Sequence, residues 1–146
     1  MNKLAEPSIP EYWRGINARF RLEGVICTKC TENIFPPRIV CPKCKATNME
    51  PKQFSGKGKL QSYTRVYDAP RGLELQVPYV MGLVKLDEGP SVTAQIVDVK
   101  PDNLKIGLDL EVIFRKINSG SGRGIVKYGF KFRPQKYLLN KSNKGD

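Results

Sequence analysis

Hydrophobic and polar positions alternate along much of the chain after residue 59, with the period of two that β-strands show. The predicted strands are Leu60–Tyr67, Tyr79–Leu86, Ser91–Val97, Glu111–Ile117 and Ile125–Phe132. The turn-forming residues of Asp87–Pro90 join the second strand directly to the third, so these two strands are expected to form a hairpin. Asp87 and Glu88 themselves are expected to be solvated turn residues rather than a catalytic pair.

Five short strands are too few for an immunoglobulin-like sandwich and match the count of an OB-type barrel, which is five-stranded and partly open. Gly82, inside the second strand, predicts a bulge or a bend there. The glycine-rich segment Ser119–Gly124 is expected to be a flexible loop between the last two strands, a position that handles ligands in OB folds. The predicted fold class is therefore mainly β.

The N-terminal residues follow a different period. Trp13, Ile16 and Phe20 lie at helical spacing, and Ser8 precedes Glu11 at the distance of a capping box. We therefore predict a helix from Ile9 to Phe20. So short a helix is marginal alone because nucleation is costly. It must dock on the rest of this chain or on a partner.

Four cysteines lie between the helix and the strands, in the pattern Cys27-x2-Cys30-x10-Cys41-x2-Cys44. Each C-x-x-C turn can offer two thiolates to one tetrahedral Zn²⁺, and the ten-residue spacer is long enough to bring the two turns together. An iron centre of the rubredoxin kind is the alternative, since four thiolates also suit iron.

A four-cysteine site leaves no coordination position open for water or substrate, so we expect the zinc to be structural rather than catalytic. Lys29, Lys43 and Lys45 are placed to offset the negative charge of four thiolates. Thr31 and Lys45 follow the second cysteine of each pair, where glycine is frequent in such turns.

The amino-acid composition excludes several classes of function. The chain has 146 residues, of which 40% are hydrophobic and 27% charged, as in a globular domain. No apolar stretch reaches the roughly 20 residues of a membrane helix. The N-terminus lacks the apolar core of a secretory signal, so no membrane association and a cytoplasmic location are expected. The absence of histidine excludes Ser-His and Cys-His nucleophiles and His-ligated catalytic zinc.

A net charge of +11 raises the possibility of nucleic-acid binding, which stays the alternative function. The charge is unevenly distributed, however. Residues 117–146 carry seven basic side chains and one acidic side chain, a balance of 7 − 1 = +6, so the other 116 residues carry 11 − 6 = +5. The body of the chain is therefore close to neutral, and nucleic acid is the less favoured partner.

Several short motifs, in order, resemble the DUF35 proteins. They are Tyr12-Trp13-Arg14, the two cysteine pairs, Phe35-Pro36-Pro37-Arg38, Gly56-x-Gly58-Lys59, Ser62-Tyr63-Thr64, Pro78-Tyr79, Leu86-Asp87-Glu88-Gly89, Ile106-Gly107 and Val112-x-Phe114. The similarity runs from about Pro10 to Pro134. Apart from the cysteines each motif is weak, but their order is specific.

The resemblance implies a helical segment at 1–21, a rubredoxin-like zinc ribbon at 22–52 and an OB-fold domain at 53–138. The mostly polar residues at 139–146 are expected to form a disordered tail. It also implies a non-catalytic protein that binds acyl-CoA or bridges acyl-CoA-handling enzymes of the thiolase or hydroxymethylglutaryl-CoA synthase type. A thiolase-type or dehydratase-type enzyme subunit is the expected partner.

Two sets of residues are candidates for binding. The candidates for CoA contact are Lys127, Lys131, Arg133, Tyr63 and Arg65. The candidates for partner contact are Trp13, Ile16 and Phe20. Basic residues that alternate with aromatic ones on an OB strand can meet phosphates, but any half-buried strand shows the same alternation. The helical stripe of Trp13, Ile16 and Phe20 could equally pack on the ribbon or the barrel of the same chain.

Overall fold

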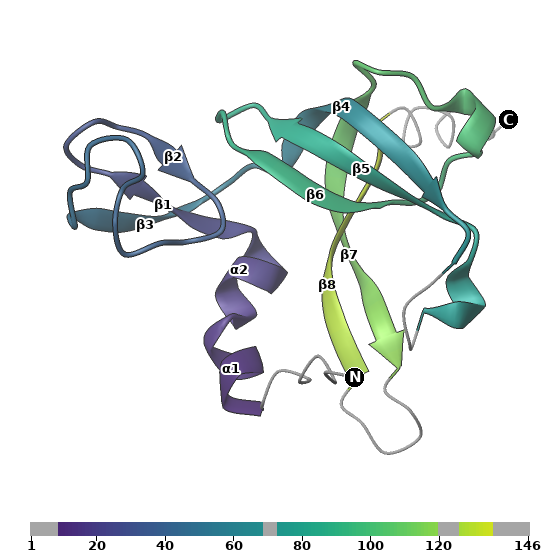
Figure 1. Ribbon diagram of the computed structural model, residues 1–146, viewed down its shortest axis with the longest axis horizontal. Helices are drawn as coiled ribbons and strands as arrows, with labels where there is room; N and C mark the ends of the chain where they lie inside the picture. Colours follow the sequence, from purple (N-terminus) through teal and green to yellow (C-terminus); the bar gives the residue numbers. More distant parts are fainter. Residues whose placement is uncertain (1–8, 69–72, 120–125, 136–146) are drawn as a thin grey trace, which may run out of the picture.

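The computed structural model describes residues 9–68, 73–119 and 126–135. A small three-stranded sheet and a larger barrel lie side by side, and two short helices lie beneath the junction between them (Figure 1). Strands dominate, so the prediction of a mainly β protein with an N-terminal helical segment is confirmed. Among the described residues, no helix combines the length and the apolar character needed to cross a bilayer.

The helical segment covers the predicted residues but is not continuous. Helix α1 spans Ile9–Arg14 and helix α2 spans Ile16–Arg21, with a break at Gly15. The prediction of one unbroken helix was therefore wrong: glycine is a poor helix former, and its carbonyl instead accepts the Arg19 N–H at 3.1 Å to start α2. Helix α2 is followed by Leu22, whose left-handed backbone caps its C-terminus, and the helix packs against β1 and β8. Ser8, the expected cap, lies outside the described residues.

The ribbon sheet is built from three antiparallel strands in the order β2-β1-β3. Its strands are β1 (Glu23–Cys27), β2 (Asn33–Ile34) and β3 (Met49–Gln53). Both edge strands pair with β1, which carries Cys27 at its end. The sequence showed no regular pattern here because strands this short contain too few residues to establish a period.

The barrel is closed, with the order β4-β5-β6-β8-β7 and a return from β7 to β4. Its strands are β4 (Lys57–Val66), β5 (Tyr79–Leu86), β6 (Ser91–Ile96), β7 (Asp109–Ser119) and β8 (Val126–Pro134). All five were predicted to within three residues at each end, and β5 and β6 form the expected hairpin. Strands β6 and β8 meet in parallel at one pair, Ile96 and Phe132.

Gly82 does not mark a bulge. It pairs regularly with Tyr63 on β4 and Ala94 on β6, and the irregularity falls opposite, between Leu60 and Ser62. A Cβ atom on Gly82 would lie 2.8 Å from the Leu60 side chain and 2.9 Å from that of Ile96. The glycine therefore allows close packing inside the barrel, and the bend stays a prediction.

The hydrophobic core lies within the barrel and extends to the base of the ribbon. Its buried members are Leu22, Phe54, Leu60, Val80, Val84, Leu86, Val92, Ala94, Ile96, Leu104, Leu110 and Phe132. On β5 and β6 these residues alternate with less buried ones, as a barrel strand requires. Leu22 and Phe54, from either end of the ribbon, join this core and tie the two parts together.

Two short 3₁₀ helices connect the strands, η1 (Glu74–Gln76) and η2 (Pro101–Asn103). Neither was predicted, because three residues give no readable periodicity. Ser119 ends β7, but the rest of the loop predicted to be flexible lies outside the described residues, as does the tail at 139–146.

Candidate metal centre

The four cysteine sulfurs form one compact cluster. All lie within 4.8 Å of one another, and the Sγ atoms of Cys27 and Cys44 are 3.5 Å apart, as are those of Cys30 and Cys41. With Zn–S bonds of about 2.3 Å, a tetrahedral site would separate neighbouring sulfurs by about 3.8 Å. Cys27 and Cys41 are fully buried, whereas Cys30 and Cys44 are half-buried. The cluster thus has the size and donor set of a structural zinc site.

The two cysteine turns have the same backbone geometry. The Thr31 N–H donates to the Cys27 carbonyl at 2.8 Å, and the Lys45 N–H donates to the Cys41 carbonyl at 3.0 Å. Thr31 and Lys45 both adopt left-handed conformations, with φ of 55° and 60°. These are the positions where glycine is frequent, and the side chains present accept a conformation that glycine adopts without strain.

Backbone amides point at the first sulfur of each pair. The Cys30 amide, together with that of Lys29, lowers the pKa of Cys27 to about 6 against the effect of burial. The Cys44 and Lys43 amides likewise lower the pKa of Cys41. Hydrogen bonds to a thiolate favour its charged form, which is the form that binds metal.

Lys43 faces the negative charge of the cluster but is shared with a carboxylate. Lys43 Nζ lies 3.1 Å from a Glu32 carboxylate oxygen, and Glu32, followed by the thiolates of Cys30 and Cys41, raises the pKa of Lys43. The residues fit one tetrahedral ion held by four thiolates, which would stabilise the ribbon and leave no position for a substrate. The same donor set also suits iron, so the choice between the two metals stays a prediction.

A second group of contacts joins the ribbon to the barrel. Phe35, between the cysteine pairs, packs edge-on against Phe54 and Phe130, with ring centroids 6.3 and 5.7 Å apart. The Asn33 side-chain amide donates to the Glu88 carbonyl at 2.8 Å, and the Ser55 N–H donates to Glu88 Oε1 at 2.7 Å.

Glu88 was expected to be a solvated turn residue, and that prediction was wrong. Its carboxylate binds the chain between β3 and β4, and Oε2 is buried. Burial opposes ionisation of Glu88, but hydrogen bonds from Ser55 outweigh it and lower its pKa. No local signal marks this role, because Ser55 is 33 residues away in the sequence.

The residues predicted to contact CoA do not form one cluster. Arg133 Nε donates to Glu111 Oε1 at 2.6 Å, and Arg65 donates to Asp102 Oδ1 at 2.7 Å. The Tyr63 hydroxyl donates to the Leu104 carbonyl at 3.3 Å. Three of the five residues are therefore engaged within the barrel.

The other two candidates, Lys127 and Lys131, lie on the same face of β8 but differ in exposure. Lys127 is half-buried, whereas Lys131 keeps only 7% of its surface exposed. Burial, with a smaller contribution from Arg115, lowers the pKa of Lys131. An alternating pattern fixes which face a residue occupies but not whether another segment covers that face.

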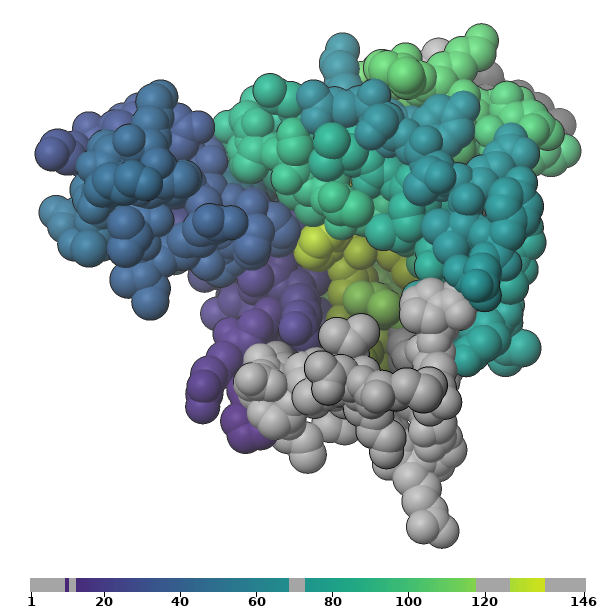
Figure 2. Space-filling model, in the orientation of Figure 1, coloured from purple at the N-terminus to yellow at the C-terminus, as the bar shows by residue number. Residues whose placement is uncertain are grey.

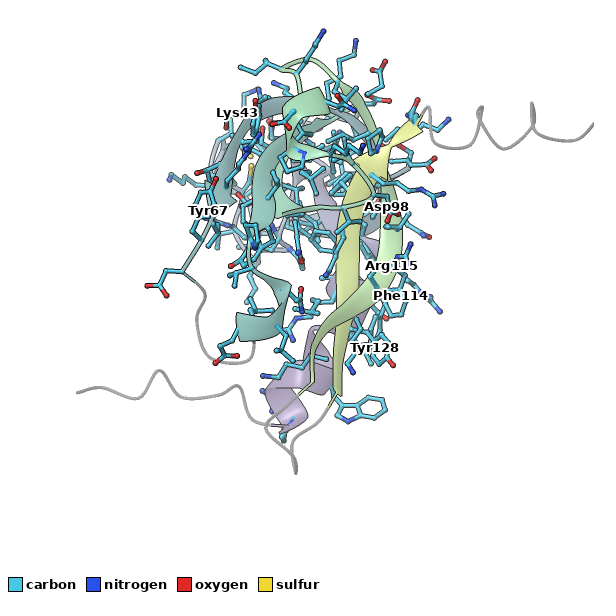
Figure 3. The ribbon with its side chains drawn as sticks, turned by 90° about the vertical axis from the view of Figure 1, so that its right-hand side faces the viewer. Lys43, Tyr67, Asp98, Phe114, Arg115 and Tyr128 are labelled. Atoms are coloured by element: carbon cyan, nitrogen blue, oxygen red, sulfur yellow. The ribbon has the colours of Figure 1, made fainter. Side chains whose placement is uncertain are left out.

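The helical stripe is divided between two environments. The Phe20 ring packs edge-on against Phe114 at 4.8 Å, and Phe114 stacks on Tyr128 at 5.7 Å. Trp13 remains 66% exposed, and Ile16 is half-buried. Figure 3 shows Phe114 and Tyr128 together beside the β7–β8 pair. We call Phe20, Phe114 and Tyr128 the aromatic ladder; the sequence did not indicate that it forms.

Comparison with known proteins finds a family match for both parts of this chain, the ribbon and the barrel. Residues 18–50 match the family model of the rubredoxin-like zinc ribbon domain of ChsH2, and residues 51–115 match that of the C-terminal OB-fold domain of ChsH2. A DUF35 domain-containing scaffold protein of Methanocaldococcus jannaschii is 42% identical over 132 residues, which are 90% of this chain and 94% of that protein.

More distant relatives include the benzoylsuccinyl-CoA thiolase subunit BbsA of Thauera aromatica, 27% identical over 112 residues, or 77% of this chain and 75% of that subunit. Among solved structures, the Ltp2-ChsH2(DUF35) aldolase gives a TM-score of 0.67 at 24% identity, over 91% of this chain and 98% of that chain. At that identity the structural likeness shows a shared fold alone. The predicted family and its ribbon-plus-barrel architecture are confirmed.

Proposed function

Because this chain belongs to the DUF35 family of zinc-ribbon and OB-fold proteins, we propose that it is a non-catalytic scaffold that bridges acyl-CoA-handling enzymes. The support from relatives is a scaffold protein that matches nearly the full chain and a thiolase subunit that matches about three quarters of it. The metal centre would contribute indirectly: an ion held by four thiolates would stabilise the ribbon beside the barrel and leave no open position for catalysis.

The observation that carries the proposal is the aromatic surface left exposed where the helical segment meets the barrel. Phe114 and Tyr128 are 52% and 41% exposed although they stack on each other, and Trp13 on α1 is 66% exposed. Exposed aromatic rings that are already fixed by packing lose little conformational entropy on binding. Tryptophan and tyrosine are also the residues in which interface energy concentrates. We propose Trp13, with Ile16 and Phe20 behind it, as the partner-binding segment.

The second part of the proposal is that the chain also contacts CoA. The candidates are Lys127, Lys131, Arg133, Tyr63 and Arg65. Lys127 has no ion pair with any described residue, so its ammonium can meet a CoA phosphate without breaking an existing contact. Arg65 and Arg133 would first have to exchange Asp102 and Glu111 for the phosphate. Lys127 is therefore the candidate that we expect to contribute most.

The scaffold role can be tested by co-expressing this chain with thiolase-type and hydroxymethylglutaryl-CoA synthase-type proteins from the same genome. We expect a complex whose mass, measured by light scattering after gel filtration, includes this chain. Trp13→Ala should weaken the complex by about 2 kcal/mol, or roughly 30-fold in affinity. It should change the melting temperature of the isolated chain little, because the ring is mostly exposed.

Leu75→Ala is the control, since Leu75 is likewise a large exposed apolar side chain but lies on η1, on another part of the molecule. It should leave the complex intact. Lys127→Glu should lower the affinity of the complex for acetyl-CoA and leave its assembly unchanged. Turnover of acyl-CoA by the isolated chain, or its failure to assemble with any enzyme of these classes, would contradict the proposal.

A further inference from the structure

A cavity of about 310 Å³ lies between η1, the helical segment and strands β5–β8. Its walls are mostly apolar and include Leu73, Tyr79, Met81 and Ile117. The volume falls at the lower end of the range of small-molecule sites, which are typically apolar with a few polar groups that fix the ligand. In Figure 2 the yellow atoms of β8 are visible in a recess between the purple helical segment and the teal strands.

The charged side chains among the cavity walls are Arg19 and Lys131, and of these two Lys131 is the buried one. It lies on β8 between Phe130 and Phe132 but faces the opposite side of the strand, and its side chain is among the cavity walls. Lys131 is 7% exposed, and it is the one charged residue among those that the described part of the chain buries. An ammonium group this far from water is costly unless an anion or several acceptors compensate it.

The protein supplies little of that compensation. Among the described residues, Lys131 has no carboxylate partner, and the one hydrogen bond that it makes to them, to Gln76 Oε1, is long at 3.4 Å. The same Gln76 oxygen also faces the Gln95 amide at 3.5 Å, and the Gln76 amide donates to the Ile117 carbonyl at 2.9 Å. The charge that lowers the pKa of Lys131, beside burial, is that of another cation, Arg115, which Asp98 already pairs at 3.2 Å.

We propose that this cavity binds a small carboxylic acid with a short apolar tail, whose carboxylate pairs with Lys131 while its tail lies along Tyr79, Met81 and Ile117. The carboxylate would supply the missing counter-charge, and the Gln76 and Gln95 amides can donate to its second oxygen. The apolar walls would exclude water from the ion pair and strengthen it. This site does not depend on the scaffold role, because it needs no partner enzyme and no CoA.

The test uses the full chain with hexanoate as the probe and hexanamide as its uncharged analogue. Saturable shifts of the Gln76 and Gln95 side-chain amides, followed by NMR, are expected with hexanoate. Hexanamide should bind at least tenfold more weakly. Lys131→Met, which keeps the length and removes the charge, should lower hexanoate affinity at least tenfold and raise the melting temperature, because the uncompensated charge is gone.

Lys127→Met is the matched control, since Lys127 lies on the same strand but is not among the cavity walls. It should change neither hexanoate affinity nor the melting temperature appreciably. Equal binding of acid and amide, no binding of either, or full hexanoate affinity in Lys131→Met would overturn the assignment. A failed complex with an acyl-CoA enzyme would bear only on the scaffold proposal.

Discussion

The zinc ribbon and the barrel are stabilised by different means. The ribbon's own buried cluster contains Cys27, Ile34 and Cys41, two of which are candidate metal ligands, whereas twelve residues form the barrel core. A segment with so little apolar burial cannot offset its own conformational entropy, so metal binding must supply much of its folding free energy. The barrel, in contrast, has the apolar layers that let a sheet fold without a metal.

The difference makes the junction between the two parts important. Phe35 reaches from the ribbon to the rings of Phe54 and Phe130, and Glu88 of the barrel holds the linking chain at Ser55. The two parts differ in what folds them, but they share packing and hydrogen bonds where they meet. Substitutions placed in the ribbon, in the barrel and at the junction should therefore have separable effects.

Removing one of the four cysteine ligands should have the largest effect on stability, and that effect should be confined to the ribbon. Cys41→Ser leaves three thiolates, and we expect loss of the metal and unfolding of residues 23–53. Zinc binding contributes about 10–16 kcal/mol in zinc-finger peptides, and most of that would be lost. Metal analysis should find about one zinc per parent chain and none in the variant, and limited proteolysis should cut the ribbon first.

Thr28→Ser, within the same cysteine turn as Cys27, is the control and should keep its zinc. If Cys41→Ser retained one metal ion, or if its barrel melted together with the ribbon, the distinction between the two parts would not hold.

A core substitution should have the next largest effect, and it should fall on the barrel. Phe132 is fully buried in the centre of the core, so Phe132→Ala should destabilise the barrel by about 3–5 kcal/mol, measured by urea unfolding. Phe114→Ala makes the same change at a ring that is 52% exposed, and it should cost much less. Zinc content should stay the same in both variants. Equal losses would show that exposure does not separate these two rings.

The junction should show a smaller, pH-dependent effect. Glu88→Gln replaces a charged acceptor of the Ser55 N–H with a neutral one, which should cost about 1 kcal/mol at neutral pH. Because the folded protein lowers the pKa of Glu88, this contribution is present above the unfolded value of about 4.3 and is lost as the pH falls through the folded value.

The measurement is the difference in unfolding free energy between the parent and Glu88→Gln across pH 3–7. Asp87→Gln, at the neighbouring exposed position, is the control and should show no comparable difference. A gap between parent and Glu88→Gln that persisted unchanged into acid would rule out the carboxylate as its source.

The smallest expected effect is a gain in the stability of the zinc-bound ribbon. Thr31 is β-branched and left-handed, so Thr31→Gly relieves backbone strain, although glycine also has more freedom to lose on folding. We expect a net gain of about 0.5 kcal/mol, seen as roughly twofold tighter zinc in a chelator competition. Thr28→Gly, at a residue with ordinary backbone geometry, should weaken zinc binding instead.

Two features were predictable because their signals are local. The spacing of Cys27, Cys30, Cys41 and Cys44 specified a single cluster, since two short turns and one spacer are all that it requires. The alternation along β5 and β6 specified strands and their hairpin for the same reason. The order of motifs also identified the family.

What covers each face was decided only by the tertiary structure. Lys131 was assigned to one face of β8, but the sequence did not indicate that it is buried or that its ammonium donates to Gln76, 55 residues away in the sequence. The same holds for Glu88 with Ser55 and for Phe20 with Phe114. A period of two assigns a residue to a side of its strand, whereas solvent exposure and ion pairing depend on segments that reach that side through the closure of the barrel.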